Sequence, residues 1–71
     1  MLHFANPDRL LSPREAAEYI NMSIHWLERQ RALGLGPDYI RLGKKGGKIW
    51  YRLSVLDAFL ASGTVRAFRA A

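Results

Sequence analysis

The side chains best suited to chemistry in this 71-residue sequence are His25 and Arg29. They lie four residues apart on a predicted helix, so both leave the same face. An arginine fork can donate two hydrogen bonds to O6 and N7 of guanine, which is worth roughly 1–3 kcal/mol of base discrimination in the major groove. The alternatives are an ion pair between Arg29 and a helix carboxylate, and a merely solvated His25. Side chains of these types on one helix face could contact a base, and Arg29 is the first candidate.

A second basic group surrounds a glycine-rich stretch, Gly43 to Gly47, in a window between Asp38 and Asp57 that contains no acid. The basic residues of this window are Arg41, Lys44, Lys45, Lys48 and Arg52. A field of one sign attracts a polyanion, and a slender loop can follow the DNA backbone or enter the minor groove. A nucleotide-binding loop would instead join a strand to a helix. Ordinary edge-strand charge is the alternative for Arg41 and Arg52.

Composition disfavours catalysis. The chain has no cysteine and only two histidines, His3 and His25, and neither stands at a recognisable spacing from a nucleophile. We therefore expect no enzyme activity, metal site, cofactor or small-molecule substrate. The length suits one small domain, and 49% hydrophobic residues indicate that it folds. Because no apolar run approaches about 18 residues and Met1 to Phe4 lacks a signal pattern, we expect no membrane contact and a cytoplasmic location.

The elements that would position these residues begin with Ser12-Pro13-Arg14-Glu15, a capping box with proline at the first helical position. A helix from Pro13 would bury Ala16, Ala17 and Ile20, with Tyr19 at the margin, and would end at Asn21. Ser23 would cap a second helix from Ile24 to about Leu33, ended by Gly34 and Gly36-Pro37. Met22 would fill the angle between them beside Ile20, Ile24 and Leu27. This spacing predicts a helix-turn-helix.

Alternation after Pro37 predicts a hairpin. We expect Ile40, Leu42, Ile49 and Tyr51 to face the core, and Tyr39, Arg41, Lys48, Trp50 and Arg52 to face outward. Ser54 would cap a last helix from Val55 to about Ser62, with an apolar stripe of Val55, Leu56, Phe59 and Leu60. Outward Tyr39 and Trp50 would pack against the tail or a neighbour, with Phe68 as one candidate. The predicted fold is α+β: a small winged helix-turn-helix at 11–63, between an arm at 1–10 and a basic tail at 64–71.

Several strings carry a family resemblance over Leu11 to about Leu60. They are Leu11 to Ile20, Ser23 to Leu27, Gly36-Pro37, Tyr39 to Gly43, and Tyr51-Arg52 followed by Leu56 to Leu60. The chain resembles the excisionase-like winged-helix family, which is related to MerR-type DNA-binding domains, although Gln30 and Trp26 depart from its common residues. The resemblance implies that the second helix enters the major groove.

The predicted DNA-contacting residues fall into two sets. The recognition-helix set is Ser23, His25, Trp26, Arg29 and Gln30. The backbone and wing set is Arg14, Arg41, Lys44, Lys45, Lys48 and Arg52. For Arg14, simple solvation is the alternative, and Ser23 serves as a cap whether or not it meets a phosphate.

Three functions are open at this point. By resemblance, the chain is a recombination directionality factor that binds DNA as a cooperative homo-oligomer, bends it and steers an integrase of the tyrosine or serine type. A transcriptional regulator would use the same residues. A basic protein-interaction module would bind an acidic partner and no DNA.

Overall fold

The computed structural model describes residues 8–44 and 46–65. Helix α1, Pro13–Tyr19, starts where predicted because its capping box forms. The Glu15 amide donates to Ser12 Oγ at 3.2 Å, and the Ser12 amide donates to the Glu15 carboxylate at 2.9 Å. Both orphan amides are thereby satisfied.

Helix α2, Ile24–Ala32, follows after a short turn, as predicted. Asn21 takes a left-handed conformation with φ of 62°, which asparagine tolerates. The prediction for Met22 is wrong, since its side chain is 40% exposed. Its amide donates to the Ala17 carbonyl at 2.9 Å, while Ile20 and Leu27 are buried in its place.

The sheet has three antiparallel strands in the order β1-β3-β2. These are β1, Leu10–Leu11; β2, Ile40–Leu42; and β3, Lys48–Arg52. The hairpin was predicted, but β1 was not, because a two-residue strand has no periodicity to detect. In this strand Leu10 pairs with Arg52 and Leu11 pairs with Tyr51. Leu10 therefore belongs to the sheet, although it was predicted to lie in the arm.

The predicted orientation of β2 is wrong. Arg41 is the cross-strand partner of Ile49, so it shares a face with Ile49 and Tyr51, whereas Ile40 and Leu42 share the opposite face with Trp50 and Lys48. Leu42 is accordingly 54% exposed. Tyr39 is 39% exposed, as predicted, although its ring lies on the Tyr51 side of the strand with the two ring centroids 6.0 Å apart. Alternation within β2 fixes which residues share a face, but the register decides which face meets the core.

Helix α3, Leu53–Ser62, starts two residues before the predicted Val55, directly after β3. Ser54 is not its cap, because the Ser54 amide itself donates to Asp8 Oδ1 at 2.8 Å. The Leu53 amide donates to the Arg9 carbonyl at 2.9 Å. A distant segment therefore satisfies the first turn of α3.

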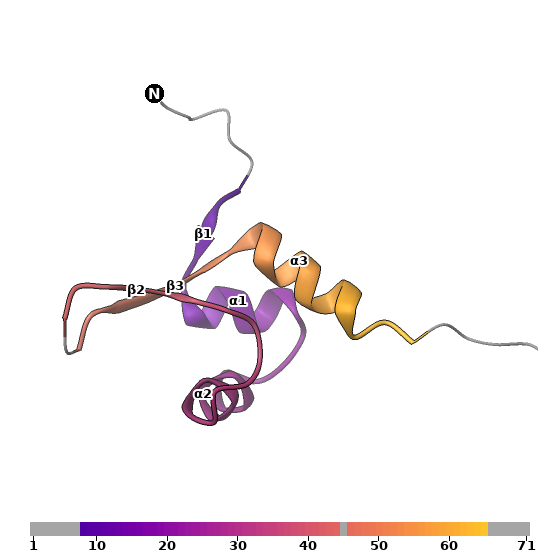
Figure 1. Ribbon diagram of the computed structural model, residues 1–71, viewed down its shortest axis with the longest axis horizontal. Coiled ribbons are helices and arrows are strands. Elements are labelled where there is room, and N and C mark those ends of the chain that lie inside the picture. Colours follow the sequence, from indigo (N-terminus) through magenta and orange to yellow (C-terminus); the bar gives the residue numbers. More distant parts are fainter. Residues whose placement is uncertain (1–7, 45, 66–71) are drawn as a thin grey trace, which may run out of the picture.

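The core lies around α1, which contacts α2, α3 and β3. Its buried residues are Leu11, Ala16, Ala17, Ile20, Leu27, Tyr51 and Leu56. In α3, Val55 and Phe59 are half-buried, but Leu60 is 42% exposed, so the predicted apolar stripe is wrong at that residue. Figure 1 shows α2 and α3 on different sides of α1, with the β2–β3 hairpin extending away from all three helices.

The result is a small α+β fold with three helices and one three-stranded antiparallel sheet in the described residues. None of those helices has the length and apolar character needed to cross a bilayer.

Candidate nucleic-acid interface

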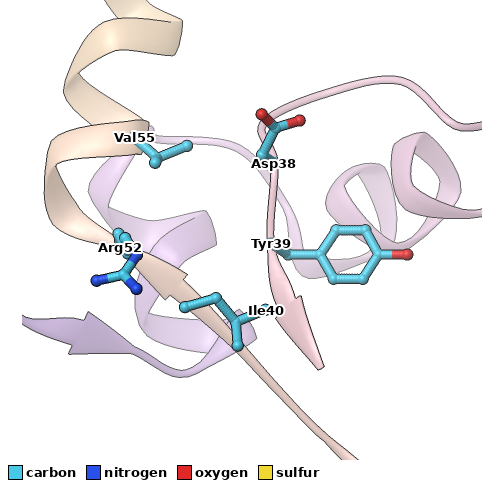
Figure 2. Close-up of a pocket in the computed structure, with 5 residues that line it drawn as sticks. All are labelled: Asp38, Tyr39, Ile40, Arg52 and Val55. Carbon is cyan, nitrogen blue, oxygen red and sulfur yellow. The ribbon is translucent and has the colours of Figure 1, made fainter. Parts of the chain in front are cut away.

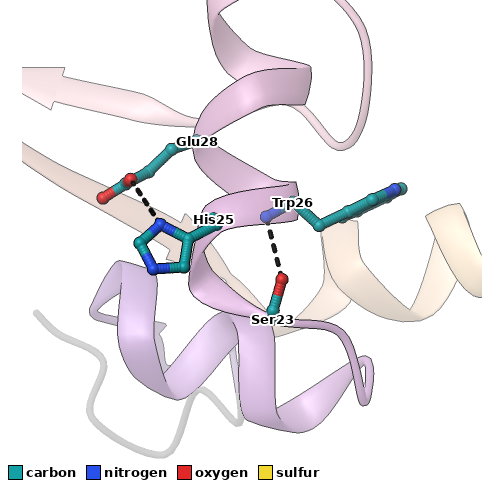
Figure 3. Close-up of polar contacts among 4 residues, drawn as sticks. All are labelled: Ser23, His25, Trp26 and Glu28. Carbon is teal, nitrogen blue, oxygen red and sulfur yellow. Dashed lines mark hydrogen bonds and ion pairs between the residues drawn. The ribbon is translucent and has the colours of Figure 1, made fainter.

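The outer face of α2 carries His25, Glu28 and Arg29, all exposed. His25 Nδ1 lies 3.9 Å from Glu28 Oε1, and these side chains are 89% and 53% exposed (Figure 3). Within the described part of the chain, Arg29 makes no ion pair or side-chain hydrogen bond. The carboxylate of Glu28 thus contacts His25 and not Arg29. The Arg29 guanidinium remains available for a ligand.

Trp26 and Gln30, placed by the sequence in the recognition set, are half-buried. Figure 3 shows Trp26 and His25 leaving opposite sides of α2. The Trp26 ring packs on Phe59 of α3, with centroids 6.4 Å apart. Gln30 lies so close to Gly36 that a Cβ there would come within 2.8 Å of the Gln30 Cβ. Trp26 therefore packs α2 against α3, and Gln30 packs it against the loop at Gly36.

Ser23 caps α2 as predicted, with its Oγ accepting from the Trp26 amide at 3.0 Å (Figure 3). Ser23, His25, Trp26 and Arg29 line one shallow depression at this end of the helix. Of the five predicted recognition residues, three are exposed and lie together on α2: Ser23, His25 and Arg29.

The predicted wing is an exposed hairpin whose loop lies far from the helices in Figure 1. Lys44 and Lys48 are exposed, and Lys48 Nζ lies 5.7 Å from the Trp50 ring centroid. A Cβ at Gly47 would overlap the Leu42 carbonyl, so the close approach of the two loop ends requires glycine. Lys45, Arg66, Phe68 and Arg69 lie outside the described residues.

Arg41 and Arg52 are both exposed but lie on opposite faces of the sheet, so they do not form one strip. Arg52 Nη1 lies 3.7 Å from Asp8 Oδ2. The Ser54 backbone amide, with Arg52 as a smaller influence, lowers the pKa of Asp8. Arg52 thus serves the junction between the arm and α3, while Arg14 is exposed in the first turn of α1.

Arg31 is a feature that sequence reasoning missed. Its Nη1 donates to the Tyr51 hydroxyl at 3.0 Å, and its guanidinium carbon lies 5.7 Å from the Tyr39 ring centroid. The Arg41 guanidinium lies 6.0 Å from the same centroid. The available signal was that Arg31 stands four residues after Leu27, a core position, and so shares its face of α2.

A hollow on the other face of the hairpin is lined by Asp38, Tyr39, Ile40, Arg52 and Val55 (Figure 2). Elsewhere, the Tyr19 hydroxyl donates to Asp57 Oδ1 at 2.6 Å, which joins α1 to α3 and raises the pKa of Tyr19. No group of three metal-ligating side chains comes together within residues 8–44 and 46–65.

Comparison with protein-family models, curated proteins and solved structures gave no significant match.

Proposed function

We propose that this chain is a winged helix-turn-helix protein that binds double-stranded DNA, with α2 in the major groove and the β2–β3 hairpin as the wing. The observation that carries the proposal is the outer face of α2. Arg29 is exposed there without an acidic partner in the described residues, and the hairpin carries only basic charge in its sequence.

The dimensions support this arrangement. A helix with its side chains is about 10–12 Å across, and the major groove is about 12 Å wide. Because α2 lies at the periphery in Figure 1, its outer face can enter a groove without displacing α1 or α3. Arg29 would then donate to guanine, and His25 would contact a neighbouring base or phosphate. The competing contact is the one between His25 and Glu28.

The wing would supply affinity without base selection. Lys44 is exposed in the hairpin loop and Lys48 is exposed at the start of β3, while Lys45 follows Lys44 in the sequence. Each lysine that neutralises a phosphate releases condensed counterions, which favours binding at low salt. A protein that docks only on an acidic partner would use the same lysines but would not need the exposed Arg29 on α2.

The experiment that tests the proposal is a titration of the protein with a selected duplex and a scrambled one, from 50 to 200 mM salt. We expect tighter binding to the selected duplex and a log–log salt slope of about −0.9 for each phosphate contacted. Absence of binding to both duplexes, together with binding to an acidic protein, would support the interaction-module alternative.

The role of recombination directionality factor is proposed on the family resemblance of the sequence strings. It includes cooperative binding of several copies and a tyrosine or serine integrase as partner. An excision assay with the cognate integrase tests it. Altered promoter output without altered excision would favour the transcriptional regulator.

A further inference from the structure

Two guanidinium groups converge on one aromatic ring between α2 and the hairpin. We propose that Arg31 and Arg41, held around Tyr39, form a binding site for a phosphodiester group of the DNA backbone. This inference rests on the proposed function and extends it. It adds Arg31 to the contact surface and gives Arg41 a particular ligand.

Arg31 is held in place before any ligand arrives. Its side chain is half-buried, and its Nη1 is bonded to the hydroxyl of Tyr51, whose side chain is fully buried at the centre of the sheet. The Tyr39 ring supports the guanidinium from another direction at 5.7 Å. Because a planar guanidinium has five donors, one bond to Tyr51 leaves others for a phosphate. A group already immobilised loses little side-chain entropy on binding.

The charge of this cluster is not balanced within the described residues. The two ion pairs found there join His25 to Glu28 and Arg52 to Asp8, so neither Arg31 nor Arg41 has a carboxylate partner. The acid nearest to Arg31 in the sequence is Glu28, which contacts His25. The acid nearest to Arg41 is Asp38, and Figure 2 shows its carboxylate and the Tyr39 ring projecting in different directions. A cation–π contact holds a guanidinium without neutralising it. The cluster therefore favours an anion.

The position of the cluster favours a DNA phosphate as that anion. A protein that places a helix in the major groove and a wing in the adjacent minor groove must cross the sugar–phosphate strand between them. Arg31 is in the last turn of α2, and Arg41 is in the first strand of the hairpin. Arg31 and Tyr39 also line a hollow with residues 34–38 of the connecting loop. Asp38 is the one acid in this lining, and it makes no ion pair within the described residues. This is the segment that would face the crossed strand.

Arg31→Gln tests the site because it removes one charge and keeps a polar side chain. The matched control is Arg9→Gln, an exposed arginine beside β1, which Figure 1 shows far from α2. Binding to a random duplex is measured from 50 to 200 mM salt. We expect Arg31→Gln to reduce the magnitude of the salt slope by about 0.9, so that the affinity lost over this range is about 3.5-fold smaller than in wild type. Arg9→Gln should leave the slope unchanged.

A second measurement locates the phosphate. A selected duplex is made with one neutral methylphosphonate at each backbone position in turn. One position should weaken wild-type binding but leave Arg31→Gln binding unaffected, because the same contact is already lost. If no position shows this coupling, the site is refuted.

The outcomes are distinguishable. If wild type binds no duplex, the proposed function fails, and this inference fails with it. If wild type binds and the folded Arg31→Gln protein keeps the full slope, only this site is overturned. If Arg31→Gln binds duplexes normally but loses affinity for a polyglutamate peptide, the ligand is a protein carboxylate and the DNA site is refuted. Should Arg31→Gln lower the melting temperature, Arg41→Gln removes the second, exposed charge and is judged by the same slope.

Discussion

Replacing Arg29 with alanine separates base recognition from folding. In the folded protein this side chain is exposed and makes no ion pair within the described residues, so truncation removes no internal contact. Alanine is at least as good a helix former as arginine. The remaining cost is loss of a positive charge in the last turn of α2, where it favours the helix dipole. We therefore expect the free energy of unfolding to change by less than about 1 kcal/mol.

The effect on DNA binding should be much larger. If Arg29 grips a guanine through O6 and N7, its loss removes roughly 1–3 kcal/mol of discrimination, which corresponds to about 5- to 150-fold in affinity for the selected duplex. A scrambled duplex lacks the paired guanine and should lose no more than about twofold. Fluorescence anisotropy on both duplexes at one fixed salt concentration measures the difference.

Arg9→Ala is the control for this experiment, since it removes the same charge from an exposed position near β1. It should change neither duplex preference nor affinity appreciably. Equal losses on both duplexes for Arg29→Ala would mean that the residue contributes only charge, and the assignment of α2 as the reading helix would then be withdrawn.

Three further changes test the wing and the fold. Lys44→Ala combined with Lys48→Ala should weaken binding to all duplexes alike and reduce the salt slope by about 0.9 per lysine, measured by the same titration; a change in sequence preference would contradict this. Asp8→Asn should flatten the acid limb of a stability–pH curve. Because the pKa of Asp8 is lowered in the folded state, its contribution is complete above the ordinary value of 3.8 and is lost as pH falls through the folded pKa; an unchanged acid limb in thermal melts would refute the cap. Gly47→Ala should distort the hairpin loop and lower affinity for every duplex, whereas Gly63→Ala, at the end of α3 with a negative φ and only ordinary contacts, should not.

Short-range sequence patterns correctly predicted the elements that are stabilised by short-range interactions. The first two helices and the hairpin follow from short-range chemistry, such as the box formed by Ser12 and Glu15 three residues apart. The start of α3 was wrong because its capping carboxylate, Asp8, lies 46 residues from Ser54. No periodicity within the helix encodes that partner.

The same distinction applies to the candidate site. Exposure of His25 and Arg29 was predictable from the apolar stripe of α2, since residues opposite that stripe face solvent. Arg31 was missed because its position depends on Tyr51, 20 residues away in the sequence and on another element. The orientation of Arg41 was wrong because it follows from its pairing with Ile49.

The contact between the segment before α1 and the start of α3 also has a kinetic consequence. The strand β1 reaches its partner β3 only after the chain between them has closed into a loop that contains α1, α2 and β2. Closing this loop costs entropy that the neighbouring helices and the hairpin do not incur. We therefore expect α1, α2 and the hairpin to assemble early, and Asp8 to reach the first turn of α3 among the last steps. Asp8 and β1, which precede all three helices in the chain, would then be among the last segments to find their place in the folded molecule.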